Sequence, residues 1–163
     1  MKKNSVHESR QSSVRKIFNS NHLNGILFTS LENIRYLCGF TGSDGAFVLA
    51  EKGSFFLTDS RYWTQADEEV KGCEIVHYKK KLDGIASLLL DLKLRRIGFE
   101  SPSLPYSLHQ SLLRKLVKEV ELHPLEEEIK NLRAVKDTEE LATIRSAIDL
   151  SSKAYRHILK ILK

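Results

Sequence analysis

An acid and a base lie two positions apart in this chain, at Asp59 and Arg61, and Tyr62 and Trp63 follow them directly. They come after a short apolar run, Ser54–Thr58, at the point where a helical pattern begins. A carboxylate and a guanidinium at this spacing can bind each other, the carboxylate can cap the helix, or both side chains can project into a cleft. The residues alone leave these alternatives open.

The other side chains that could do chemistry match no catalytic pattern. None of the six histidines has a carboxylate at the spacing of a metal site. The segment Gly42–Gly45 lacks the upstream glycine of a nucleophile elbow and predicts a tight turn. Cys38 and Cys73 have no paired spacing, and we interpret them as two small buried side chains in a reduced compartment.

One alternative groups three carboxylates, Asp44, Asp59 and Glu100, as the metal ligands of a nuclease. Their contexts argue against it, because Asp44 lies in a predicted turn and Glu100 directly precedes Ser101-Pro102. The formal net charge is +5, but the basic residues are scattered and Lys79–Lys81 is their only run. Such a run indicates a solvated loop rather than a nucleic-acid site. We therefore expect no nucleic-acid partner.

The elements that must position these residues alternate between strands and helices. The apolar runs 46–50 and 54–58 are bounded by turn residues and predict a hairpin with Gly53 in its loop. Further strands are predicted at 26–28, 74–78, 96–99 and 121–125. Helices are predicted at 12–21, 30–38, 60–71, 82–92 and 108–117. Ser30 and Ser60 are the expected N-caps of the second and third of these helices. Residues 1–11 are polar and are expected to be frayed. The alternation favours an α/β layered domain with a mixed β-sheet flanked by helices, since the hairpin adds an antiparallel pair.

A long helix is predicted after Asp137, which forms a capping box with Glu140. The residues of one face then recur at alternating spacings of three and four and form an apolar seam, at Leu141, Ile144, Ile148, Ser151, Tyr155, Ile158 and Leu162. This seam requires a packing partner. It predicts either a coiled-coil dimer or, as we prefer, a helix that packs on a further part of the protein.

The amino-acid composition limits the class of protein to which this chain can belong. Hydrophobic residues make up 41% of the 163 residues and charged residues 29%, which is typical of one soluble globular domain. The longest apolar runs, such as Ala86–Leu90, are too short to cross a bilayer. No apolar region follows Met1-Lys2-Lys3, so a signal peptide is not indicated. We expect a cytoplasmic protein that does not enter a membrane.

Several motifs together resemble the amino-terminal domain of the creatinase/prolidase family, which comprises Xaa-Pro aminopeptidases and Xaa-Pro dipeptidases. The motifs are Asn33–Leu37, Gly39–Gly45, and Asp59–Tyr62 with Gln65-Ala66, in this order and spacing. A second patch, Leu132-Arg133 through Lys136, Glu139-Glu140 and Ile144-Arg145, resembles the family's linker into its catalytic domain. The resemblance implies that residues 1–129 form a domain of this family, with a ribonuclease H-like layout. It also implies that residues 130–163 are a linker and the start of the first helix of a carboxy-terminal metallopeptidase domain.

Members of the family hydrolyse the bond before proline with two divalent metal ions, for which manganese, cobalt or zinc are the candidates. Two aspartates, a histidine and two glutamates of the carboxy-terminal domain hold these ions, which polarise the carbonyl and supply a hydroxide. The resemblance therefore implies no catalytic, cofactor-binding or metal-binding residue in this chain, which would be inactive alone. The implied partners are its own carboxy-terminal domain, further copies in a homodimer or larger homo-oligomer, and short proline-containing peptides.

In this family the amino-terminal domain forms part of the wall of an active site, often the active site of a partner subunit. The resemblance thus implies that Arg61 and Tyr62 contact the far end of a substrate. There the Arg61 guanidinium would suit a carboxylate of the substrate, and Asp59 lies beside Arg61 in the sequence as a further possible contact. Trp63 then offers a surface for proline or an anchor in the core or an interface. The alternative is a peptidase-like module that has lost catalysis and binds a protein, with which the positive charge is compatible.

Overall fold

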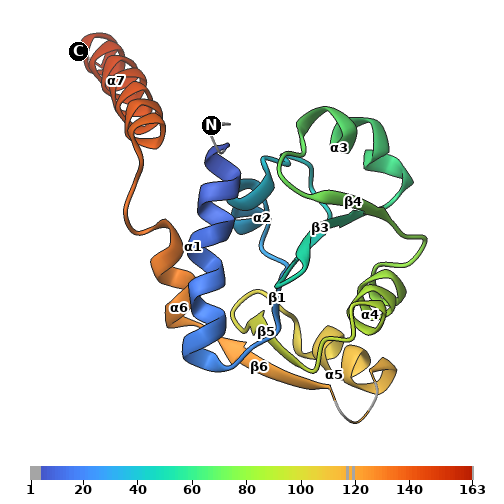
Figure 1. Ribbon diagram of the computed structural model, residues 1–163. Helices are drawn as coiled ribbons and strands as arrows, with labels where there is room; N and C mark the ends of the chain where they lie inside the picture. Colours follow the sequence, from blue (N-terminus) through green and yellow to red (C-terminus); the bar gives the residue numbers. More distant parts are fainter. Residues whose placement is uncertain (1–4, 117, 119, 163) are drawn as a thin grey trace. The chain divides into compact units, whose positions relative to one another are not determined.

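The computed structural model describes residues 5–116, 118 and 120–162, apart from the side chain of Asn19. The chain divides into two compact units, Met1–Ile129 and Lys130–Lys163 (Figure 1). In this described part of the chain, no helix combines the length and the apolar character needed to cross a bilayer.

Within the described residues, six strands of the first unit form one sheet in the order β4-β3-β2-β1-β5-β6. They are β1 (Gly25–Phe28), β2 (Ala46–Ala50), β3 (Gly53–Thr58), β4 (Glu74–His77), β5 (Arg96–Glu100) and β6 (Glu121–Leu125). The pairs β1–β2 and β2–β3 are antiparallel, whereas β1–β5, β3–β4 and β5–β6 are parallel. The predicted α/β fold with a mixed sheet is confirmed.

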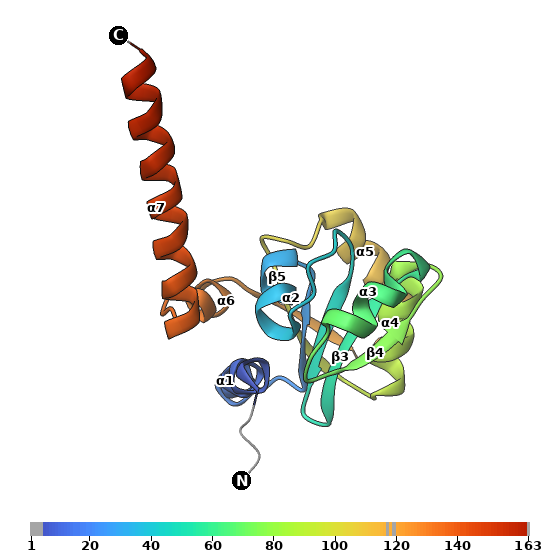
Figure 2. The same ribbon diagram turned by 90° about the horizontal axis from the view of Figure 1, so that it is seen from above.

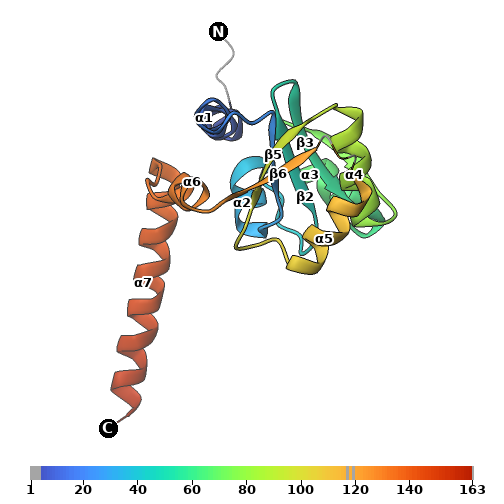
Figure 3. The same cartoon turned by 90° about the horizontal axis from the view of Figure 1, so that it is seen from below.

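Helices cover both faces of this sheet. They are α1 (Val6–Asn21), α2 (Leu31–Cys38), the 3-10 helix η1 (Ser60–Tyr62), α3 (Trp63–Glu69), α4 (Lys81–Asp91), α5 (Tyr106–Lys115) and α6 (Glu127–Lys130). The helices α1 and α2 lie on one face and α4 and α5 on the other (Figures 2 and 3). Neighbouring side chains of a strand point to opposite faces, and both faces of this sheet are covered. Every residue of the central strands β1 and β2 is therefore buried, which explains their continuous apolar sequences.

The first helix begins earlier than its apolar pattern suggested. Ser5 caps α1 in a capping box with Glu8. Gln11 is buried, where its Nε2 donates to the carbonyl of Leu37 at 3.0 Å and its Oε1 accepts from the Ser54 hydroxyl at 2.7 Å. The prediction of a frayed segment was therefore wrong for residues 5–11. Residues 1–4, and Val117 at the end of the predicted helix 108–117, lie outside the described residues.

A buried carboxylate joins β5 to the start of α2. Glu100 is 1% exposed, and its Oε2 accepts from the backbone N–H groups of Thr29 at 2.5 Å and Ser30 at 2.7 Å. Its Oε1 accepts from Nδ2 of Asn33 at 2.5 Å. Ser30 is the N-cap that the sequence predicted, with its hydroxyl accepting from the Asn33 N–H. The first N–H groups of a helix have no partner within the helix, and negative charge is favourable beside them. Glu100 thus supplies that charge from a distant strand.

A second set of polar contacts attaches the loop after α2 to the end of α3. The Glu69 carboxylate accepts from the Thr41 N–H at 2.7 Å, from the Thr41 hydroxyl at 2.8 Å and from Nε2 of Gln65 at 3.0 Å. Desolvation acts to raise the pKa of Glu69, but the hydrogen bonds from Gln65 and Thr41 leave this pKa below its ordinary value. These contacts, which we call the Glu69 clasp, hold the loop Gly39–Gly45 beside α3.

The second unit consists of the short 3-10 helix η2 (Asn131–Arg133) and the long helix α7 (Thr138–Ile161). The predicted capping box is present, since Asp137 accepts from the Glu140 N–H and Glu140 accepts from the Asp137 N–H. No residue of α7 is buried, and seam residues such as Ile148 and Tyr155 are exposed. What covers this seam in the whole protein stays a prediction.

Replacing Glu100 by glutamine should lower the free energy of unfolding by about 2–4 kcal/mol, because an amide cannot accept all the hydrogen bonds of the buried carboxylate. Urea unfolding followed by circular dichroism measures this. Glu121→Gln is the matched control, since Glu121 is exposed on β6 and its contacts with Arg96 at 3.8 Å and His123 at 3.2 Å lie at the surface. Equal unfolding midpoints for Glu100→Gln and the unaltered chain would contradict the proposed role of Glu100.

The Glu69→Gln variant should weaken the pH dependence of stability. Because the pKa of Glu69 in the folded chain is lowered, its contribution is fully present above the ordinary glutamate pKa and is lost as the pH falls through the folded value. Between about pH 5 and pH 3, the urea midpoint of the unaltered chain should therefore fall further than that of the variant. Glu68→Gln, at an exposed neighbour, is the control and should keep the original profile. Superimposable profiles for Glu69→Gln and the unaltered chain would count against the clasp.

Candidate functional site

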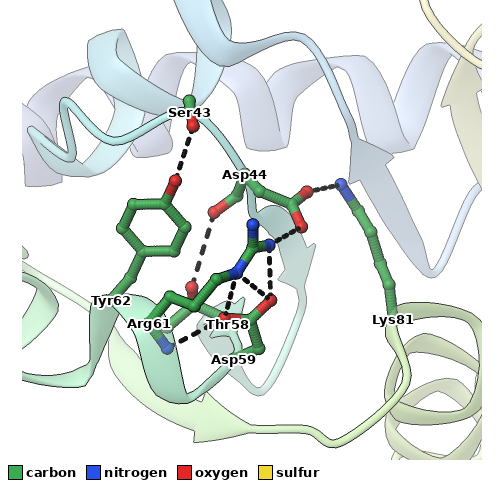
Figure 4. A network of polar contacts seen from close by, with 7 residues as sticks. All are labelled: Ser43, Asp44, Thr58, Asp59, Arg61, Tyr62 and Lys81. Carbon is green, nitrogen blue, oxygen red and sulfur yellow. Dashed lines mark hydrogen bonds and ion pairs between the residues drawn. The ribbon is translucent and has the colours of Figure 1, made fainter.

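The predicted pair of Asp59 and Arg61 lies where β3 passes into η1 (Figure 4). Oδ1 of Asp59 accepts from the Arg61 N–H at 3.0 Å, which caps η1. Nε of Arg61 donates to Oδ1 at 3.0 Å, and Nη2 donates to Oδ2 at 2.7 Å. The ion pair and the helix cap therefore form together. The prediction that Ser60 is the N-cap was wrong, because Asp59 occupies the extended position before the helix and Ser60 is already its first residue.

The fold brings two further charges to this pair, Asp44 from the loop after α2 and Lys81 from the first turn of α4. Oδ2 of Asp44 accepts from Nη2 of Arg61 at 3.0 Å, and Oδ1 accepts from Nζ of Lys81 at 2.6 Å. Two carboxylates and two cations thus alternate in one network, as Figure 4 shows. The interpretation of the basic run at 79–81 as a solvated loop is wrong for Lys81, whose side chain is only 28% exposed. No local pattern signals this contact, because it joins residues far apart in the sequence.

Asp59 and Arg61 stabilise each other's charged forms. The hydrogen bonds from Arg61 hold the pKa of Asp59 below its ordinary value, and the hydrogen bond to Asp59 raises the pKa of Arg61 in turn. Neither group is therefore suited to proton transfer. The Arg61 side chain is 62% exposed, and its carboxylate contacts use only Nε and Nη2. Its remaining Nη1 is suited to an outside acceptor such as a carboxylate.

The two aromatic residues that follow lie at the surface. The Tyr62 and Ser43 hydroxyls are 2.5 Å apart, and the Tyr62 ring meets the Phe40 ring edge-on at a centroid distance of 5.7 Å. Trp63 is 42% exposed and stacks on His77, with ring centroids 4.5 Å apart and planes at 20°. Trp63 is therefore not a core residue, and its exposed face is available to a ligand or an interface.

The buried residue Tyr78 lies close to the charged network. It is 7% exposed, and its hydroxyl makes no hydrogen bond of good geometry with any described residue. Burial raises the pKa of Tyr78, and the nearby charge of Asp44 adds to this effect. Tyr78 is thus a buried and uncharged neighbour of the network. The sequence patterns assigned Tyr78 only to the end of a strand and did not indicate this position.

The described residues contain no group of three or more His, Cys, Asp or Glu side chains that could hold a metal ion. Asp44 and Asp59 are paired with Lys81 and Arg61, and Glu100 is bound at the start of α2. The carboxylates considered for a nuclease are therefore not assembled as a metal site. Nor does any described cluster fit the pair of metal ions that the resemblance implies.

The two cysteines differ in burial. Cys38, the last residue of α2, is fully buried, whereas Cys73, directly before β4, is only partly buried. The Cys38 thiol donates to the carbonyl of Ile34 at 3.3 Å. The interpretation of both cysteines as buried side chains is therefore confirmed for Cys38 and wrong for Cys73.

Comparisons with known proteins extend over almost the whole chain. Residues 10–135 match the family model of the Creatinase/Prolidase N-terminal domain. The uncharacterized peptidase YqhT of Bacillus subtilis (strain 168) is 35% identical over 151 residues, which cover 92% of this chain and 42% of YqhT.

Solved structures of similar proteins agree with this match. An Xaa-Pro dipeptidase from Bacillus anthracis has a TM-score of 0.89 at 28% identity, over 95% of this chain and 43% of that chain. The N-terminal domain of the cytoplasmic peptidase PepQ from Mycobacterium tuberculosis H37Rv has a TM-score of 0.71 at 27% identity, over 77% of this chain and 98% of that chain.

This chain thus spans less than half the length of YqhT and of the Bacillus anthracis dipeptidase. The matched segment 10–135 contains the whole charged network, from Asp44 to Lys81. Sequence motifs, the family model and the shared fold all agree on one assignment. The chain belongs to the creatinase/prolidase N-terminal domain family.

Proposed function

We propose that this chain is the non-catalytic amino-terminal domain of a metal-dependent peptidase that hydrolyses Xaa-Pro bonds. One observation carries the proposal: nearly the whole chain matches less than half of an Xaa-Pro dipeptidase. The described residues also contain no cluster that could bind a metal ion, so a metal-dependent reaction needs ligands from elsewhere in the protein.

The rest of the protein would supply the chemistry. In this proposal, residues 130–163 lead into a carboxy-terminal domain that holds two divalent ions, namely manganese, cobalt or zinc. The exposed apolar seam of α7 supports this role, because such a seam requires a packing partner. We further propose that the whole protein is cytoplasmic, as PepQ is described to be. It would act as a homodimer or larger homo-oligomer in which this domain restricts access to the active site.

The charged network would serve substrate recognition. Arg61 is exposed yet held by Asp59 and Asp44, so its guanidinium is oriented before a ligand arrives. Its Nη1 would bind the terminal carboxylate of a short proline-containing peptide. The partly buried ring of Tyr62 and the exposed ring of Trp63 would then contact the apolar proline ring.

The isolated 163-residue chain should not hydrolyse a dipeptide such as Gly-Pro, with or without added manganese or cobalt. The full-length protein under the same conditions should release proline, which a colorimetric proline assay measures. Metal-dependent turnover by the isolated chain would overturn its non-catalytic assignment. If the full-length protein also lacks activity and metal ligands, the alternative of a protein-binding module without catalysis is supported instead.

In the full-length enzyme, Arg61→Ala should lower kcat/KM for an Xaa-Pro dipeptide by about 10- to 100-fold, which corresponds to one charge-assisted hydrogen bond. Arg61→Lys should give an intermediate value, because lysine keeps the charge but not the planar fork.

Arg114→Ala is the matched control, since Arg114 is an exposed arginine of α5 that donates to Ser111 and lies outside the network. Its kcat/KM should equal that of the unaltered enzyme. If Arg61→Ala folds normally and keeps full kcat/KM, Arg61 does not contact the substrate, while the peptidase assignment itself would stand.

A further inference from the structure

A cavity of about 260 Å³ opens at one end of the sheet in the first unit. Its lining comes from the loop between β2 and β3, from the residue before β1 and from the segment that joins α4 to β5. Here β3 starts and α4 ends, whereas the charged network lies where β3 ends and α4 begins. The cavity is therefore separate from the candidate site described above.

Positive charge predominates around this cavity. Three of its lining residues are basic, namely Lys52, Lys93 and Arg95, and all three are exposed. Glu51 is its acidic lining residue. None of these four side chains forms an ion pair with a described residue, so Glu51 offsets one positive charge and two remain. A concave surface with such an excess attracts a small anion that carries two negative charges.

Lys93 occupies a position that glycine normally takes. It directly follows Leu92, the C-cap of α4, and its φ of 55° lies in the left-handed region. The Lys93 N–H donates to the Leu90 carbonyl at 2.9 Å, and the Leu94 N–H donates to the Leu89 carbonyl at 3.2 Å. These bonds form a Schellman motif, in which a side chain is strained and glycine is not. A function for the lysine side chain would explain its presence at this position.

Hydrogen bonds hold the walls of the cavity in place. The Asn24 N–H donates to the Arg96 carbonyl at 2.8 Å, and the Arg96 N–H donates to Oδ1 of Asn24 at 3.2 Å. On the hairpin side, Nη2 of Arg15 from α1 donates to the Ser54 hydroxyl at 3.0 Å. The walls are thus formed before any ligand arrives, which lowers the cost of binding.

We propose that this cavity binds a small phosphate monoester, with Lys52, Lys93 and Arg95 contacting the phosphate group. Guanidinium and ammonium groups are the usual protein partners of phosphate. The buried side chains of Ala50 and Leu94 also line the cavity and offer an apolar surface to the organic part of the ligand. Its volume lies just below the roughly 300–1,000 Å³ of sites for drug-sized molecules, which favours a small ligand. The proposal does not depend on the peptidase activity proposed above.

The test is an NMR titration of the backbone amides of the 163-residue chain with glycerol 3-phosphate. Sodium chloride keeps the ionic strength constant, so that general screening does not change during the titration. The amides of residues 50–53 and 92–95 should shift and reach saturation. Inorganic phosphate should shift the same amides with a weaker affinity, because it lacks the organic part, and glycerol should shift none of them.

Two variants remove one positive charge each from the lining. Lys93→Gly and Lys52→Ala should each weaken glycerol 3-phosphate binding by about tenfold or more, since each loses a charge-assisted hydrogen bond. Glycine adopts the left-handed conformation without strain, so the urea midpoint of Lys93→Gly should not fall. A lysine at this end of α4 also interacts favourably with the helix carbonyls, but that effect acts on stability and not on phosphate binding.

Lys79→Ala is the matched control. Lys79 is exposed, forms no ion pair with a described residue and does not line the cavity, so this variant loses the same charge elsewhere. It should keep the affinity of the unaltered chain. The proposal is overturned if the shifts do not saturate, if inorganic phosphate binds as tightly as the monoester, or if Lys79→Ala weakens binding as much as Lys93→Gly. Unchanged affinity in both lining variants would overturn it as well.

Discussion

The fold of the first unit depends on the burial of one carboxylate. An ionised carboxylate inside a protein costs several kcal/mol unless hydrogen bonds compensate for the lost water. For Glu100 that compensation comes from the N–H groups of Thr29 and Ser30 and from the amide of Asn33. These donors are in place only when β1 pairs with β5 in the observed parallel register and α2 begins directly after β1. The sheet and the helix are therefore stabilised by the same interaction.

The position of α2 in turn determines where the candidate site lies. The helix ends at Gly39, whose left-handed conformation sends the chain toward α3, and the Glu69 clasp holds the loop there. Asp44 at the end of this loop then meets Arg61 and Lys81. Because these ion pairs are partly exposed, their contribution to stability is small. Their main effect is to orient the Arg61 guanidinium, which is what recognition of a carboxylate requires.

One titratable group thus acts on the loop after α2. The clasp depends on the ionised Glu69, and its strength therefore varies with pH. The clasp lies close to the charged network without belonging to it. The loop is accordingly where solution conditions are expected to influence the site.

The sequence by itself determined the order of the six strands and of the longer helices, the family, and the local pair of Asp59 and Arg61, but it did not indicate the short helix α6. These follow from period, capping and turn signals that act over a few residues, as in the capping box of Asp137 and Glu140. Ser5 and Glu8 form a capping box of the same kind. It explains why α1 begins earlier than its apolar pattern indicates.

Only the tertiary structure decided that Asp44 and Lys81 join Arg61 and that the buried Tyr78 lies near them. Each of these contacts joins segments separated by many residues, and no local pattern encodes it. They exist because the packing of α2, α3 and α4 on one sheet brings the ends of these helices together.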